Sequence, residues 1–129
     1  MITREKVDQL EKIVGQTEGM HQEVSALARK SPNGSLNKFK LQIVNGLLAD
    51  CNNLLADSHK AVKGFDKFNS DDIPSNSDVT FILTQYIQAL EKFRADNIVF
   101  DWNDHQWHYD LPKKAGTLRA AAPQKLKKG

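Results

Sequence analysis

The sequence predicts a mainly α fold: a three-helix antiparallel bundle with a small C-terminal β-hairpin and a flexible basic tail. Apolar residues recur at three- and four-residue steps along three long segments, which is the spacing of one face of an α-helix. Residues 98–109 instead fit two short strands joined by a tight turn. The 129 residues suffice for one domain. We expect a helical domain with the hairpin over residues 1–111 and the tail over residues 112–129.

The first predicted helix runs from about Thr3 to Arg29, and Thr3 is its expected N-cap. Gly15 and Gly19 lie four residues apart and therefore on the same face of this helix. Glycines there allow another helix to approach closely, or alternatively mark a point where the helix bends. The helix is then a peripheral member of the bundle or an arm that binds a partner. We expect part of it to pack against a second copy of the chain in a homodimer.

The second predicted helix runs from about Leu36 to Lys63, with Ser35 as its cap, and its apolar stripe is broad. A broad stripe is typical of a helix that is buried against two neighbours, so we expect this helix to be central. Cys51 lies within the stripe and is interpreted as a small buried hydrophobic residue. The stripes of the second and third helices predict a shared core of Phe39, Ile43, Leu47, Leu54, Ile82, Tyr86 and Leu90.

An acidic connection over residues 64–76 leads to the third helix, which is expected to end near Ala95 with Ser75 or Ser77 as its cap. The aspartates of this connection do not have the spacing of a calcium-binding loop, so no metal site is predicted in it. Three apolar residues are expected to hold the connection against the bundle: Phe65, Phe68 and Ile73.

The aromatic stretch after the third helix predicts a hairpin with a two-residue turn at Asn103-Asp104. The opposed pairs on its aromatic face are then Ile98 with Tyr109, Phe100 with Trp107, and Trp102 with His105. A two-stranded ribbon is only marginally stable alone, so we expect this face to pack against the helices. The alternative is an exposed platform for a protein partner or a nucleobase.

The sequence contains no phosphate-binding glycine loop, no nucleophile elbow and no Cys-x-x-Cys pair. It therefore predicts no catalytic residue and no cofactor. His105 and His108, with Asp101, Asp104 or Asp110, have the chemistry of metal ligands. The expected register puts the two histidines on opposite faces of the hairpin, so no metal site is predicted there.

The basic charge of the chain is concentrated at its C-terminal end. Residues 111–129 contain six Lys or Arg and no Asp or Glu, whereas residues 1–110 contain twelve Lys or Arg and sixteen Asp or Glu. The tail offers little apolar area, and we expect it to be mobile from about Ala115 onward. A basic tail either binds an anionic surface such as nucleic acid or simply remains solvated.

These observations favour a small non-enzymatic protein-interaction or regulatory module whose partner the sequence does not identify. One alternative is a nucleic-acid-binding accessory protein that uses the tail and the adjacent aromatic residues; another is an enzyme whose site is assembled from dispersed residues. The single cysteine and the lack of a long apolar run favour the cytoplasm over secretion or a membrane. The residues expected to contact a protein or nucleic-acid partner are Trp102, Trp107, Tyr109, Lys113, Lys114, Arg119, Lys125, Lys127 and Lys128.

Overall fold

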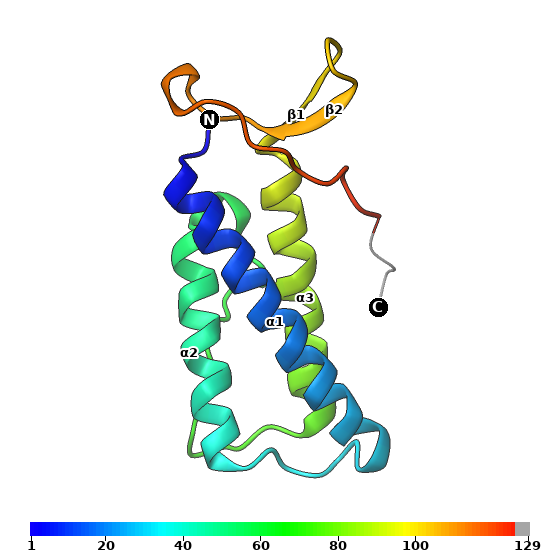
Figure 1. The fold of residues 1–129 in the computed structure, drawn as a ribbon. Coiled ribbons are helices and arrows are strands. Elements are labelled where there is room, and N and C mark those ends of the chain that lie inside the picture. The colour runs from blue at the N-terminus through cyan, green and yellow to red at the C-terminus, as the bar shows by residue number, and fades with distance from the viewer. Residues whose placement is uncertain (126–129) are drawn as a thin grey trace.

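The computed structural model describes residues 1–125 as three helices that carry a β-hairpin at one end (Figure 1). In chain order the elements are α1 (Arg4–Lys30), α2 (Lys38–Leu55), the 3-10 helix η1 (Asp57–His59), α3 (Asn76–Ala95), β1 (Ile98–Asp101), β2 (Gln106–Tyr109) and the 3-10 helix η2 (Lys113–Ala115). The prediction of a mainly α fold with three helices and a C-terminal hairpin is confirmed. None of the helices within residues 1–125 is long and apolar enough to cross a membrane.

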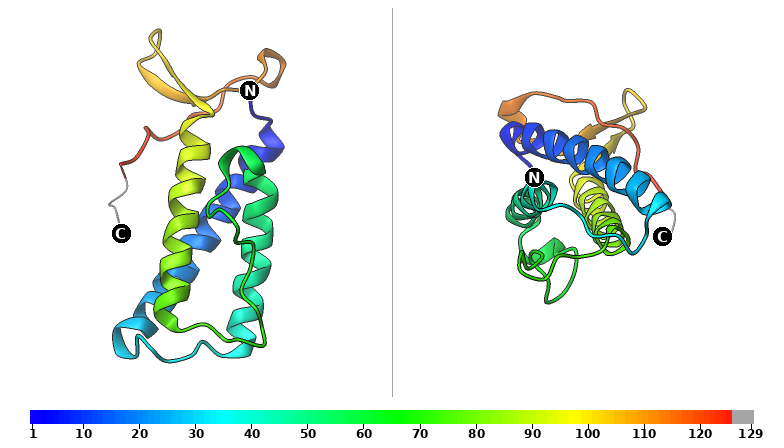
Figure 2. Two further views of the ribbon diagram at one scale, coloured as in Figure 1. Left: turned by 180° about the vertical axis from the view of Figure 1, so that it is seen from behind. Right: turned by 90° about the horizontal axis from the view of Figure 1, so that it is seen from below.

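The direction of the helices differs from the prediction in one respect. α1 runs antiparallel to both other helices and crosses them at an angle, whereas α2 and α3 run parallel to each other (Figure 2). The residues just before α2 and α3 lie together, because Ser35 pairs with Ser75 in an isolated bridge and the Leu36 amide donates to the Pro74 carbonyl at 3.3 Å. The long connection after α2 returns along the bundle before α3 begins, and this return permits the parallel arrangement.

Each of the three α-helices begins with a side-chain cap. Thr3 and Ser75 accept hydrogen bonds from backbone amides of the first turns of α1 and α3, which confirms both expected caps. α2 is capped by Asn37 rather than by Ser35, and it therefore starts two residues later than expected. It also ends at Leu55, eight residues before the predicted end, because the chain turns at Ala56 with a positive φ of 54°.

The returning connection is fixed to α2 by asparagine side chains. Asn45 exchanges two hydrogen bonds with the backbone of Phe68, and Asn52 donates to the Asp66 carbonyl at 3.0 Å. The prediction that apolar residues hold this connection on the bundle is confirmed, since three of them are half-buried against the core: Phe65, Phe68 and Ile73.

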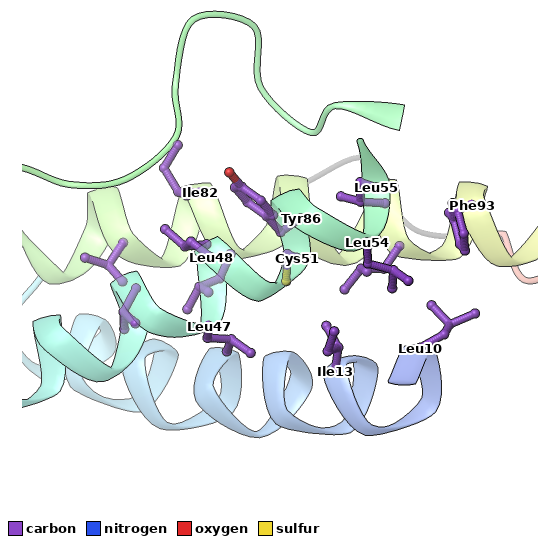
Figure 3. Close-up of a cluster of buried hydrophobic side chains, with 14 of the residues drawn as sticks. Leu10, Ile13, Leu47, Leu48, Cys51, Leu54, Leu55, Ile82, Tyr86 and Phe93 are labelled. Carbon is purple, nitrogen blue, oxygen red and sulfur yellow. The ribbon is translucent and has the colours of Figure 1, made fainter. Parts of the chain in front are cut away.

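The core lies between the three helices (Figure 3). The most extensive contact between helices is that of α1 with α3. Leu10 and Leu48 face this core from α1 and α2. Tyr86 of α3 is fully buried, and its hydroxyl donates to Asn52 Oδ1 at 2.8 Å. The expectation that the second helix is central is therefore wrong, because α1 and not α2 makes the larger contact with α3.

The core predicted for the second and third helices is only partly correct. Phe39 and Ile43 are 71% and 44% exposed, whereas the other five residues predicted to share the core are buried. α2 turns a different part of its broad stripe inward, and the residues at the centre of its buried face are Leu41, Val44, Leu48, Cys51 and Leu55. A stripe that is apolar over much of the helix circumference does not specify which half faces the core.

Cys51 is fully buried, as expected. Burial raises the pKa of its thiol to about 11, and the thiol lies 3.6 Å from the Thr17 hydroxyl. A thiol with so high a pKa holds its proton at neutral pH, so Cys51 behaves as part of the core rather than as a nucleophile.

Candidate interaction surface at the hairpin end

The hairpin has the predicted register. Ile98 pairs with Tyr109 and Phe100 pairs with Trp107 in an antiparallel ladder. The turn differs, because the strands stop one residue earlier on each side and leave a four-residue connection over residues 102–105. His105 lies in this connection with a positive φ of 55°.

Two aspartate side chains explain the longer turn. Asp101 accepts a hydrogen bond from the backbone amide of Asn103 at 2.8 Å, and Asp104 accepts one from Gln106 at 3.0 Å. Such local bonds compete with the ladder for the backbone amides and stabilise a turn instead. The tip of the hairpin is therefore fixed by its own side chains.

The burial of the aromatic face changes along the hairpin. Ile98 and Tyr109, at its base, are buried against the helices, and Phe100 and Trp107 are half-buried. Trp102, near the tip, is 77% exposed. The expectation that this face packs on the helices is therefore confirmed for the base, whereas the tip projects beyond the bundle (Figure 1).

The aromatic rings near the tip support one another. The Phe100 ring makes edge contacts with the rings of Trp102 and Trp107 at centroid distances of 4.6 and 5.5 Å. His105 lies 6.4 Å from Trp102 on the same face. These edge-to-face arrangements are favourable, so Trp102 is held in place while most of its surface remains open to solvent.

The opposite face of the hairpin is polar. His108 Nε2 lies 2.7 Å from Asp104 Oδ2, and ligand atoms of His108, Asp104 and Asp101 lie within 4.8 Å of one another. Although desolvation opposes the change, the hydrogen bonds from His108 and from the Gln106 amide lower the pKa of Asp104. These three residue types can bind a metal ion. Here their side chains form the hydrogen bonds that stabilise the turn.

A hollow of about 610 Å³ separates the hairpin from the loop that follows it. Val99 and Trp102 of the hairpin line this hollow, together with Leu111 and Lys113 of the following loop. Val99 is 47% exposed. An exposed tryptophan beside an apolar hollow is an arrangement that suits contact with another molecule.

Beyond this loop, the tail lies along β2. The Tyr109 amide donates to the Leu118 carbonyl at 2.9 Å, and the Ala120 amide donates to the Trp107 carbonyl at 3.0 Å. His108 and Arg119 form the isolated bridge between these two bonds. The tail thus pairs with the outer edge of β2 around this bridge.

Arg94 of α3 connects the tail to the helices. Its guanidinium group is paired with the Glu91 carboxylate through Nε at 2.7 Å, and the two side chains are only 10% and 13% exposed. The hydrogen bond to Glu91 raises the pKa of the Arg94 guanidinium above its ordinary value, and desolvation of this group opposes the shift. The remaining Arg94 nitrogens donate to the carbonyls of Ala121 and Ala122, both at 2.8 Å.

The structure distributes the predicted contact residues over three settings. Trp102 is open to solvent and Trp107 is half-buried, whereas Tyr109 is buried with its hydroxyl 3.4 Å from Glu11 Oε1 and so supports the base of the hairpin. Four basic residues are exposed, namely Lys113, Lys114, Arg119 and Lys125. The two remaining ones, Lys127 and Lys128, lie outside the described residues.

The flexibility of the tail stays a prediction, because it concerns motion. The structure identifies the contacts that have to break for residues up to Gln124 to leave the body, and sequence reasoning missed them. Most of them join Arg94, Glu91 or Arg4 to the tail backbone, which composition does not reveal. The only signal for the Glu91–Arg94 pair is the three-residue spacing of opposite charges on a predicted helix.

Comparison of the chain with protein-family models, with curated proteins and with solved structures gives no match. The functional argument therefore rests on the geometry of the hairpin end.

Proposed function

We propose that this protein is a non-enzymatic interaction module that binds a protein partner through the aromatic tip of its hairpin. The observation that carries the proposal is Trp102, which is 77% exposed and yet held against Phe100 at 4.6 Å. Tryptophan is among the residues that most often dominate the binding energy of protein interfaces. A ring that is already held in one position loses little further entropy on binding.

The hollow beside Trp102 supports the same proposal. Val99 and Leu111 contribute apolar surface to its lining, so a partner side chain inserted there makes apolar contacts with the protein. Trp102 and this hollow together form one continuous surface that a protein partner can bury. The cytoplasmic location expected from the sequence belongs to this proposal, and the buried, reduced Cys51 is compatible with it.

The test is a comparison of two exposed aromatic residues. Phe81 of α3 is 61% exposed and belongs to a different surface, so Phe81→Ala is the matched control for Trp102→Ala. The tagged full-length protein and both variants are used to isolate partners from the native host. The proposal expects a partner that is retained by the Phe81→Ala variant and lost with Trp102→Ala. A partner that both variants retain equally contradicts it.

Nucleic-acid binding is the second candidate. Lys113 lines the same hollow as Trp102, which suits a nucleotide that stacks on the ring and places its phosphate at the lysine. Asp101 and Asp110 also line this hollow, and their charges repel a phosphate. This candidate expects binding of single-stranded DNA or RNA that weakens steeply with salt and is reduced by Lys113→Gln together with Lys114→Gln.

Self-association is proposed on another face. Gly19 of α1 and Gly46 of α2 line a groove of about 370 Å³ together with Met20 and Ile43, and a Cβ added at either glycine would meet no atom within 4 Å. Phe39 is exposed on α2, the helix that forms one wall of this groove. A two-fold dimer buries such a face twice and so offers each copy the apolar groove of the other.

Sedimentation equilibrium tests the dimer with matched variants. The dimer proposal expects a concentration-dependent mass that Ile43→Ser shifts toward the monomer and that Phe81→Ser leaves unchanged. A monomer at every concentration from micromolar to millimolar contradicts it.

No enzymatic role is proposed. The largely buried ionisable residues Glu91 and Arg94 are hydrogen-bonded to each other, and Arg94 also donates to the tail backbone.

A further inference from the structure

Most of the hydrogen bonds that hold the tail go to its backbone, and the side chain of Arg119 adds one to Gln106 Oε1. Arg94 donates to the carbonyls of Ala121 and Ala122, and Glu91 Oε2 accepts from the Gln124 amide at 3.0 Å. The edge of β2 adds two ladder bonds to the backbone on either side of Arg119. Any extended peptide presents the same carbonyls and amides, so these groups form a general receptor for extended backbone.

The cleft beneath the tail is larger than the side chains that cover it. Its volume is about 340 Å³, and Val14, Ile87 and Leu90 contribute apolar walls from α1 and α3. The tail borders it with the small side chains of Ala120, which is half-buried, and Ala121, which is exposed. A methyl group fills little of such a volume, and a larger aliphatic side chain in its place gains more apolar contact.

The charge around the cleft favours a basic ligand. Glu11 and Glu18 line it from α1, and both are exposed at its edge. Arg94, its buried cation, is already paired with Glu91. Arg119 of the tail also lines the cleft, so the resident segment itself carries a basic residue next to Ala120.

We propose that this cleft is a docking site for an extended segment of another protein, which the tail occupies in the free molecule. The segment has a large aliphatic residue in the place of Ala120 and a basic residue beside it. The tail competes because it is attached, which gives it a high effective concentration of about the millimolar range. The proposal uses neither Trp102 nor the hollow beside it, so it stands or fails separately from the proposed function.

The first test asks whether the cleft accepts a large aliphatic side chain. Ala120→Leu in the full-length chain is expected to slow hydrogen exchange of the residue 120 and Gln124 amides by about tenfold, because the leucine adds buried apolar area. Ala122→Leu is the control, since Ala122 is exposed, and it leaves these rates unchanged. Unchanged or faster exchange in the Ala120→Leu variant contradicts the proposal.

The second test supplies the segment as a separate molecule. The probe is a labelled synthetic peptide of residues 116–124 that carries Ala120→Leu, and the control peptide keeps Ala120. The receptors are the full-length protein and its Ala120→Pro variant, in which proline removes the amide that bonds the Trp107 carbonyl and so loosens the tail. Fluorescence anisotropy measures the affinities.

The proposal expects the leucine peptide to bind the Ala120→Pro chain about tenfold more tightly than the control peptide does, because of the added apolar burial. It also expects weaker binding to the unmodified chain, where the tail competes. No binding to the Ala120→Pro chain at millimolar peptide overturns it. A dimer of the unmodified chain in which the tails are exchanged between copies also overturns it, because the occupant is then a second copy of the chain.

Discussion

The helical core and the hairpin end are held together by different interactions. In the core, side chains such as Leu48 and Leu83 are fully buried, and removal of apolar area from water is the main source of stability. At the hairpin end, β2, Arg94 and Glu91 hold the tail largely through hydrogen bonds to backbone groups. The core therefore depends on which side chains are present, whereas the tail contacts depend on the presence of an extended chain. A region bound in this second way is suited to exchanging one segment for another.

The largest expected effect is in the core. Leu48→Ala is expected to lower the free energy of unfolding by about 2–5 kcal/mol, because a fully buried leucine leaves a cavity. Phe39→Ala, on the exposed side of the same helix, is expected to change it by less than about 0.5 kcal/mol. Urea denaturation measures both. Equal losses for the two variants would mean that Phe39 is buried in solution by a second copy or by a different packing of α2.

The next largest effect on stability is expected for the ion pair of Glu91 and Arg94, which joins the helices to the tail. Arg94→Ala leaves the Glu91 carboxylate without its cation and removes two bonds to the tail, so we expect a loss of about 1–3 kcal/mol. Arg4→Ala serves as the comparison, because Arg4 is exposed and donates to the tail carbonyls of Ala115 and Thr117. Denaturation midpoints distinguish them, and a midpoint unaffected by Arg94→Ala would show that this pair does not stabilise the fold.

Acid is expected to weaken an ion pair near the end of α3. The hydrogen bond from His59, with that from Lys92, lowers the pKa of Asp96 below the ordinary value of 3.8. Because the pKa of Asp96 is lower in the folded state than in the unfolded state, its ionised carboxylate stabilises the fold. This stabilisation is fully present above the pKa of the unfolded state and is lost as the pH falls through the pKa of the folded state. The dependence of stability on pH below about 4 should therefore be shallower in Asp96→Asn, as measured by thermal denaturation between pH 5 and pH 2. An unchanged slope would assign the acid sensitivity to other carboxylates.

The smallest effect on stability is expected at the tip of the hairpin. Trp102 is largely exposed, so Trp102→Ala should change the unfolding free energy by less than about 0.5 kcal/mol. Trp107→Ala is the contrast, since Trp107 is half-buried against the core and should cost more. A large loss with Trp102→Ala would show that this ring stabilises the fold rather than remaining available to a partner.

The sequence predicts the elements whose signals are local. The caps Thr3 and Ser75, the hairpin register and the helical periods each depend on a few neighbouring residues, and these predictions are confirmed. Local signals do not specify which side of the broad stripe of α2 is buried, and Phe39 was misplaced for that reason. They also do not specify that α2 and α3 run parallel, which depends on the length of the returning connection.

The candidate surface was predictable only in part. The alternation of residues 98–109 identifies the aromatic face, but the exposure of Trp102 depends on where the helices end beneath the hairpin. The position of the tail depends on Arg94 and Glu91, whose partners are backbone atoms some 30 residues away in the chain. Bonds to distant backbone atoms leave no pattern in the sequence.

Native-state hydrogen exchange tests the difference between the two regions most directly. We predict that the amides of Tyr109, Ala120 and Gln124 exchange through local openings with a free energy at least about 2 kcal/mol below that of Val44 and Leu83 in the helices. Their exchange should also show a weaker dependence on denaturant, because little surface is exposed when only the tail opens. Equal opening free energies and equal denaturant dependences for both sets would contradict the account, because the tail would then open only when the whole protein unfolds.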